Sequence, residues 1–211
     1  MVLALLVQIG FASQGFYHGS VGPATPLKEK PPPAMNAIHP TAWAVMSTSC
    51  GEMAFELYEN ETPVTTGNFI NLSKQEFYSQ TIFHRVAKGF VIQGGGFTGD
   101  MVLKPSPFPP IKLEISPMLN NSRGTISMAR TSDPDSATTQ FFINLVDNSR
   151  NLGPNGVSSG GYAVFGRVIL GMDVVDSIAN VTVSDNCGGE SSLPVSPIII
   201  ESVSILPVPP K

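Results

Sequence analysis

Charged residues are scarce in this sequence, and no part of it is strongly basic. Asp, Glu, Lys and Arg make up 13% of the 211 residues, whereas they make up about a quarter of a typical soluble protein. The formal net charge is −4, and the 12 Lys and Arg residues form no cluster. Because a nucleic-acid-binding surface needs clustered basic side chains, we expect no nucleic-acid partner.

Cysteine and histidine are also few. Cys50 and Cys187 can form one disulfide or remain two separate thiols, and the sequence leaves both alternatives open. The histidines, His18, His39 and His84, are scattered, and no CxxC or Cys/His spacing is present. We therefore predict no metal site.

Motifs for covalent or phosphate chemistry are absent or out of context. Residues 156–160 match G-x-S-x-G, but a strand rather than a helix is predicted to follow, and the last histidine, His84, lies upstream. The glycines at 94–96 are not followed by Lys-Ser or Lys-Thr, so they predict no phosphate-binding loop. No carboxylate pair has a recognisable acid/base spacing. The sequence predicts neither a serine nucleophile nor a cofactor.

The apolar run at the N-terminus, Met1–Ala12, is too short to span a bilayer but suits a signal peptide, although no Lys or Arg precedes it. We expect a signal segment over residues 1–18, a proline-rich linker over 19–40, one domain over 41–207 and a tail over 208–211. If the segment is a signal, the protein is exported to the periplasm or secreted; otherwise it is cytoplasmic. No transmembrane span is expected.

Glycine and proline are abundant, at 20 and 19 residues, which fits many turns between short strands. Apolar or alternating runs predict strands. These are Trp43–Thr48, Met53–Tyr58, Ile82–Val86, Phe90–Gln93, Gly124–Arg130, Gln140–Val146, Ala163–Ile169 and Ile198–Leu206. Helices are predicted at Pro63–Ser73, with Thr62 as N-cap, and at Gly171–Asn180. Loops are predicted elsewhere, including Thr182–Pro197. Many strands and two helices favour an antiparallel sandwich or closed barrel.

One predicted bent strand pair, residues 83–97, combines Arg85 with aromatic residues, Gln93 and three consecutive glycines. By itself it leaves Arg85 as a surface residue of a strand or as a charge held over a pocket. Strand alternation places Phe141 and Phe142 on opposite faces and puts Gln140 on the face of Phe142. One of the two aromatic rings should therefore belong to the core.

Three long motifs resemble those of the cyclophilins, the peptidyl-prolyl cis–trans isomerases. They are FHRVAKGFVIQGGGFTGD (Phe83–Asp100), GTISMARTSDPDSATTQFFINLVDN (Gly124–Asn148) and GYAVFGRVILGMDVVDSI (Gly161–Ile178). The three motifs occur in the same order as in cyclophilins, and their sequences are most similar to those of bacterial members. The resemblance covers about Trp43 to Pro207. It implies a closed eight-stranded antiparallel β-barrel capped by two short helices.

The resemblance implies that Arg85 is the catalytic residue and that His84 supports it. The substrate-binding residues that it implies are Phe90, Val91, Gln93, Ala129, Arg130, Gln140, Phe142, Leu152 and Tyr162. Asn151 stands where the family often has an aromatic residue, so we expect weak cyclosporin binding and regard the register of Leu152 as the least secure assignment. A monomer that acts on proline-containing polypeptides is expected.

Isomerisation of an X–Pro bond needs no covalent step, in agreement with the missing nucleophile. Twisting the amide returns a lone pair to the prolyl nitrogen, and a donor such as Arg85 would stabilise that state. The sequence leaves two alternatives to catalysis: a binding module or holdase that uses the same groove, and an assembly factor attached through the proline-rich segment.

Overall fold

The computed structural model describes residues 38–158, 160–186 and 189–210 of the chain. The predicted signal segment, most of the predicted linker and Cys187 lie outside these residues. Cys50 is exposed and free. In the described ranges, no helix is long and apolar enough to cross a membrane.

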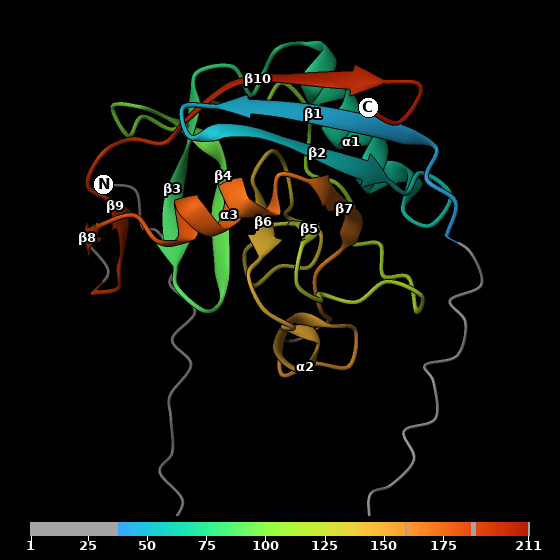
Figure 1. The fold of residues 1–211 in the computed structure, drawn as a ribbon. Coiled ribbons are helices and arrows are strands. Elements are labelled where there is room, and N and C mark those ends of the chain that lie inside the picture. The colour runs from blue at the N-terminus through green and yellow to red at the C-terminus, as the bar shows by residue number, and fades with distance from the viewer. Residues whose placement is uncertain (1–37, 159, 187–188, 211) are drawn as a thin grey trace, which may run out of the picture. The chain divides into compact units, whose positions relative to one another are not determined.

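Eight strands of the described chain form a closed antiparallel barrel, in the order β1-β10-β3-β4-β6-β5-β7-β2 (Figure 1). Their bounds are β1 Ala42–Thr48, β2 Gly51–Leu57, β3 Thr81–Ala87, β4 Val91–Thr98, β5 Thr125–Met128, β6 Phe141–Asn144, β7 Val164–Leu170 and β10 Ile199–Leu206. The predicted closed eight-stranded antiparallel barrel is therefore confirmed.

The barrel interior is filled by one side-chain set from each strand. In β1, every second residue from Ala42 to Thr48 is buried, which is the period of a half-buried strand. Phe141 is fully buried and packs edge-to-face on Phe83 and Phe69, with ring centroids 5.8 and 5.9 Å apart. The prediction that one of the two phenylalanines in β6 belongs to the core is thus confirmed for Phe141.

The glycines of β4 make room for these rings. Gly94 lies opposite Phe83 on one side and Phe141 on the other, and a Cβ on Gly94 would lie 3.0 Å from the Phe83 ring. Gly95 has φ +82°, and a Cβ there would lie 2.8 Å from Phe141 and 2.9 Å from Tyr78. Because these contacts are too short for a real Cβ, larger residues would displace the core.

Helix α1, Pro63–Lys74, confirms the helix predicted at Pro63–Ser73. It packs on β10 and β7 and buries Phe69 and Leu72. Val64, in the first turn of this helix, is 49% exposed. Thr62 occupies the N-cap position without a capping side-chain bond. The carboxylate of Glu114 caps the helix instead, accepting bonds from the N–H groups of Val64 and Thr65 at 3.1 and 2.6 Å.

Helix α3, Met172–Ala179, packs on β2, β3 and β4 and buries Val175 and Ile178. Two predicted loops contain further structure. A one-turn helix, α2, runs over Ser149–Leu152, so the prediction of only two helices is wrong. The predicted loop Thr182–Pro197 contains an antiparallel hairpin of β8, Val183–Asp185, and β9, Ser191–Pro194. In Figure 1 this hairpin lies beside β3, outside the barrel.

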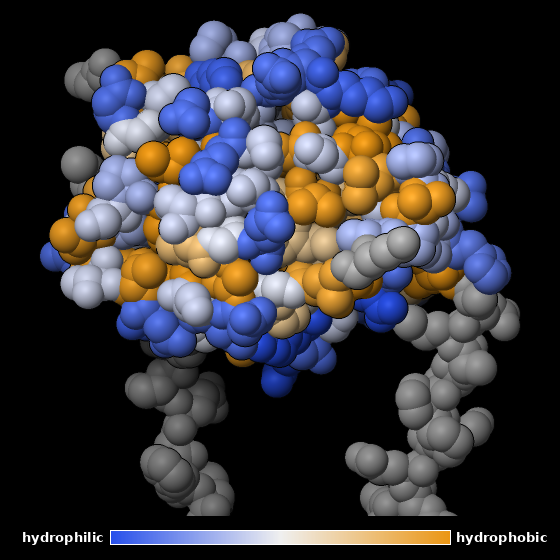
Figure 2. Space-filling view, turned by 45° about the horizontal axis from the view of Figure 1, so that its top comes forward, coloured by the Kyte–Doolittle hydropathy of each residue, from blue (hydrophilic) through white to orange (hydrophobic). Residues whose placement is uncertain are grey.

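The low charge of the sequence is visible on the surface. On the face drawn in Figure 2, hydrophobic residues lie interspersed among hydrophilic ones rather than beneath a continuous charged layer. Large hydrophobic side chains are exposed by 38% to 74% at Val64, Met101, Val102, Leu103, Met118, Val146, Val157, Leu170, Val195 and Val208.

Candidate active site

A row of side chains crosses the barrel wall on one face. Arg85 of β3 lies opposite Gln93 of β4, and Gln93 lies opposite Phe142 of β6. Directly opposed residues of neighbouring strands point to the same side of a sheet. We call Arg85, Gln93 and Phe142 the strand row. The strand pairing alone therefore aligns a permanent cation, an amide and an apolar ring.

Phe142 is the centre of a small apolar cluster that is separate from the barrel core. Val91, Phe142 and Leu152 are 2%, 4% and 6% exposed, and the Phe142 ring meets the Tyr162 ring edge-to-face with centroids 5.5 Å apart. Phe90 and Ala129 pack against the cluster, partly buried. Six of the substrate-binding residues that the family resemblance implied thus gather at one place. Leu152, whose register was the least secure assignment, is among them.

Two arginines border this cluster on aromatic faces. The Arg85 guanidinium carbon lies 5.8 Å from the centroid of the Phe90 ring. The Arg130 guanidinium carbon lies 4.6 Å from the centroid of the Tyr162 ring, and its Nε and Nη2 donate to the Gly161 carbonyl at 3.0 and 2.8 Å. Arg130 therefore fixes the loop that carries Tyr162.

The two glutamines of the site bind each other. Gln93 Nε2 donates to Gln140 Oε1 at 3.0 Å. Gly96 lies directly beneath the Gln140 side chain, and a Cβ at this position would collide with it. The third glycine of the triplet thus provides the space that lets Gln140 reach Gln93.

His84, next to Arg85, is neutral at neutral pH. Burial, together with the positive charge of Arg85, lowers the pKa of His84 to about 4, and a backbone hydrogen bond with Ile82 offsets this in part. Its ring lies edge-on to Phe97, with centroids 4.7 Å apart, and its Nδ1 is buried with no hydrogen-bond partner among the described residues. His84 therefore contributes an uncharged, largely buried ring next to Arg85 on β3.

Arg85 has a partner that no motif indicated. Its Nε donates to Glu190 Oε2 at 2.8 Å and its Nη2 donates to Glu190 Oε1 at 2.7 Å. Glu190 precedes β9 in the hairpin that was predicted to be a loop, 105 residues from Arg85. The hydrogen bonds from Arg85 hold the pKa of the Glu190 carboxyl below its usual value.

Buried asparagine side chains hydrogen-bond the loop segments that contribute residues to the cluster. We call Phe90, Leu152 and Tyr162 the loop wall. Asn121 Nδ2 donates to the carbonyls of Leu152 and Tyr162 at 2.9 and 3.3 Å, and Asn148 Nδ2 donates to the carbonyl of Phe90 at 2.9 Å. Asn144 links the other two amides: its Nδ2 donates to Asn121 Oδ1 and its Oδ1 accepts from Asn148. These asparagines are 0% to 2% exposed, so one buried network holds all three segments.

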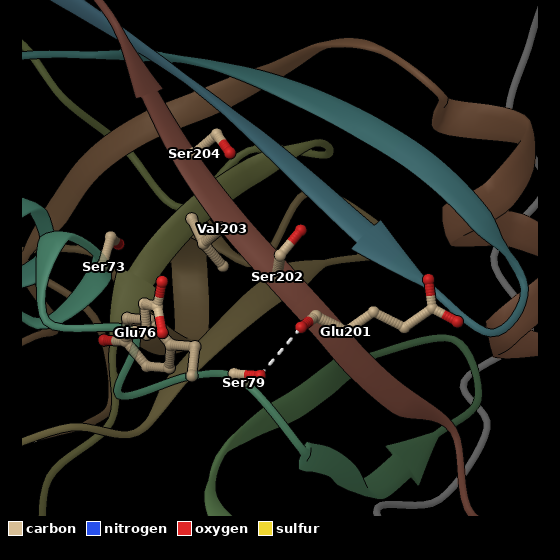
Figure 3. Close-up of a pocket in the computed structure, with 8 residues that line it drawn as sticks. Ser73, Glu76, Ser79, Glu201, Ser202, Val203 and Ser204 are labelled. Atoms are coloured by element: carbon tan, nitrogen blue, oxygen red, sulfur yellow. Dashed lines mark hydrogen bonds between the residues drawn. The ribbon is translucent and has the colours of Figure 1, made fainter.

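A polar hollow lies away from this site. It has a volume of about 300 Å³ between the end of α1 and strand β10, and serine and glutamate side chains line most of it (Figure 3). Its residues belong to neither the strand row nor the loop wall. Among the residues that the structure describes, no group of three or more His, Cys, Asp or Glu could hold a metal ion.

Comparison with known proteins decides the family. The family model of cyclophilin-type peptidyl-prolyl cis–trans isomerases matches residues 43–205. The chain belongs to this family. It is 51% identical over 160 residues to a peptidyl-prolyl cis–trans isomerase of Acinetobacter baylyi, an alignment that covers 76% of this chain and 83% of that protein. It is 44% identical to peptidyl-prolyl cis–trans isomerase B of Escherichia coli, over 75% of this chain and 96% of that protein.

Solved structures agree with this assignment. The fold resembles a crystal structure of a Cryptosporidium parvum cyclophilin-type isomerase with a TM-score of 0.65, 31% identity and coverage of 80% of this chain and 99% of that one. That isomerase has also been crystallised in the presence of the dipeptide Ala-Pro, in a structure with a TM-score of 0.63 to this chain. The chain is thus a peptidyl-prolyl cis–trans isomerase, and the substrates of its family are proline-containing peptides.

Proposed function

We propose that Arg85 is the catalytic residue of this cyclophilin. Rotation about an X–Pro bond crosses a barrier of about 20 kcal/mol, because the planar amide is stabilised by resonance. At the twisted geometry the prolyl nitrogen regains its lone pair and can accept a hydrogen bond. An N–H donor aimed at that nitrogen stabilises the twisted state but not the planar ground state, which is the condition for acceleration. Arg85 remains charged at any working pH.

The remaining site residues hold the peptide around the bond that turns. Phe142, Val91 and Leu152 would form the floor on which a proline ring lies. The Phe90 ring, whose centroid is 5.8 Å from the Arg85 guanidinium carbon, would border that floor. The Gln93 and Gln140 side chains are hydrogen-bonded to each other in the free protein. On substrate binding they would form hydrogen bonds to the peptide backbone instead. Ala129 and Arg130 would border the chain of the substrate.

The single observation that carries this assignment is the strand row, which places the Arg85 donor two strands away from Phe142 on the same face. The test is the cis/trans exchange rate of an Ala-Pro peptide, measured by NMR with wild-type protein and the Arg85→Ala variant. We expect Arg85→Ala to lower the rate constant by at least about tenfold, equivalent to about 1.4 kcal/mol of transition-state stabilisation.

Arg167→Ala is the matched control, because Arg167 is 51% exposed and its ion pair with Glu56 lies outside the cluster. This variant should retain the wild-type exchange rate. An unchanged rate for Arg85→Ala would refute the role of Arg85. Peptide binding without acceleration by the wild type would instead favour a holdase.

We also propose that the protein is a monomer that binds cyclosporin weakly. Asn151, in α2, is exposed and directly precedes Leu152. The family resemblance implies an aromatic residue at this position. Asn151→Trp should therefore raise the affinity for cyclosporin in isothermal titration calorimetry. Light scattering during size-exclusion chromatography should give the mass of one chain. An Asn151→Trp affinity equal to that of the wild type would contradict the assigned reason.

Export is a further proposal, and it rests on the composition of residues 1–18 alone. An apolar run of about a dozen residues suits the hydrophobic core of a signal peptide. Mass spectrometry of the protein from its native host should find an N-terminus downstream of Met1. An intact Met1 would contradict export by cleavage and would favour a cytoplasmic location.

A further inference from the structure

Glu190 is bound to one edge of the Arg85 guanidinium, the edge formed by Nε and Nη2. A guanidinium has five N–H donors in a rigid plane. Glu190 takes the donor on Nε and one donor on Nη2, which leaves the Nη1 donors and the second Nη2 donor for a substrate. Such a two-point contact fixes the plane of the guanidinium as well as its position.

The Glu190 carboxylate is itself held in place by its hairpin. Ser192 Oγ donates to Glu190 Oε2 at 2.9 Å, and Asn186 Oδ1 accepts the Glu190 backbone N–H at 3.1 Å. Asn186 Nδ2 in turn donates to Ser192 Oγ at 3.1 Å. Ser192 is 1% exposed, so this part of the hairpin is anchored. The Glu190 carboxylate that accepts from Arg85 is therefore held in place before a substrate binds.

The hairpin is also fixed relative to the strand that carries Arg85. Strand β9 packs on β3, and Figure 1 shows the two elements side by side. The Arg85 and Glu190 side chains are 27% and 31% exposed. At such exposure an ion pair adds little to folding stability, so its main physical effect is to restrict the many rotamers of a long arginine side chain.

We propose that Glu190 is a positioning residue for Arg85, which orients the guanidinium toward the twisted prolyl nitrogen. This inference rests on the proposed role of Arg85. A side chain that acts only through a transition-state donor should affect kcat and leave KM unchanged. The contact also occupies two of the N–H donors of Arg85. The opposite hypothesis is therefore that Glu190 competes with the substrate for Arg85 and lowers the activity. The two hypotheses predict opposite changes in kcat.

The test compares Glu190→Ala and Glu190→Gln with the wild type, using the full chain and a proline-containing peptide. Glu190→Ala should lower kcat by about fivefold or more, with KM within about twofold of the wild type. Glu190→Gln keeps one oxygen acceptor, and its kcat should lie between those of Glu190→Ala and the wild type. Glu201→Gln is the matched control, because Glu201 lies on β10 at the distant polar hollow (Figure 3), and it should behave as wild type.

Three further measurements keep the test decisive. The Arg85 Nε–H signal in ¹H–¹⁵N spectra should lose its protection in Glu190→Ala. A positioning role predicts that kcat falls together with this loss of protection, whereas a purely structural role predicts the same spectral change with kcat unaltered. Thermal melts show whether the hairpin variants fold. Ser192→Ala, which keeps the carboxylate but removes one of its restraints, should lower kcat less than Glu190→Ala.

The outcomes separate this inference from the proposed role of Arg85. If Arg85→Ala is impaired and the Glu190 variants are not, only the positioning role is overturned. If Arg85→Ala is itself fully active, the catalytic assignment fails first. A higher kcat in Glu190→Ala, or a loss carried by KM alone, overturns positioning. Adding Glu190→Gln to Arg85→Ala should cause no further loss, because the pair acts as a unit.

Discussion

The strand row and the loop wall meet at the same cluster, but they are held in place by different forces. Arg85, Gln93 and Phe142 are aligned by main-chain pairing between β3, β4 and β6. The same pairing closes the whole barrel. Phe90, Leu152 and Tyr162 depend instead on side-chain amides of a few buried asparagines. The difference teaches that the strand side of the cluster should be as stable as the barrel, whereas a single substitution should loosen the loop side.

The largest effect should come from truncating the two apolar anchors, one from each region. Phe142→Ala should lower the free energy of unfolding by about 3–5 kcal/mol, because the rigid barrel cannot fill the space. Leu152→Ala should cost about 2 kcal/mol, near the lower limit for such changes, because its loop can relax. Urea unfolding measures both, and kcat/KM should fall in both. Equal stability losses would contradict the distinction between the regions.

The stability of the protein should depend on pH through His84, which lies next to Arg85 on β3. The native pKa of His84 is about 4, and the pKa in the unfolded chain is near the ordinary value of about 6.5. As the pH falls from 6.5 to 4, the unfolded state therefore binds a proton that the native state does not. The free energy of unfolding should decrease over this range by up to about 3 kcal/mol.

His84→Gln should remove that part of the pH dependence in urea unfolding curves recorded at pH 7, 5.5 and 4.5. His39→Gln is the control, because His39 is exposed, and this variant should follow the wild type. A wild-type slope in His84→Gln would show that another group causes the loss.

A smaller effect is expected from Asn121, which holds the loop wall. Asn121→Ala leaves the carbonyls of Leu152 and Tyr162 without their buried donor, which should cost about 2 kcal/mol of stability. KM should rise more than kcat falls, because the wall loosens while Arg85 stays in place. The neighbouring Asn120 is exposed, and Asn120→Ala should change neither. A loss in kcat alone would mean that the network acts on the strand row.

The strand side of the molecule could be predicted from the sequence because it depends on local periodicity. Alternation in the motif at β6 separated Phe141, which enters the core, from Phe142, which faces the cluster. The barrel followed from the strand count and from the family resemblance, and most strand bounds differ from those predicted by only a few residues.

The contacts that complete the site could not be predicted, because each joins residues far apart in the chain through ordinary polar side chains. Nothing in a Gly/Ser-rich stretch distinguishes Glu190 from a solvated glutamate, and its partner is 105 residues away. Asn121 resembled a loop residue, and Glu114 gave no sign that it caps a helix 50 residues upstream. Such partners are set by the finished fold, so only a structure reveals them.

One measurement tests the central claim most directly: an NMR titration that yields both peptide affinity and cis/trans exchange rate for wild type and Arg85→Ala. If Arg85 stabilises the twisted amide, the variant should bind the Ala-Pro peptide with a Kd within about threefold of the wild type and exchange it at least about tenfold more slowly. A variant that exchanges the peptide at the wild-type rate would contradict the claim.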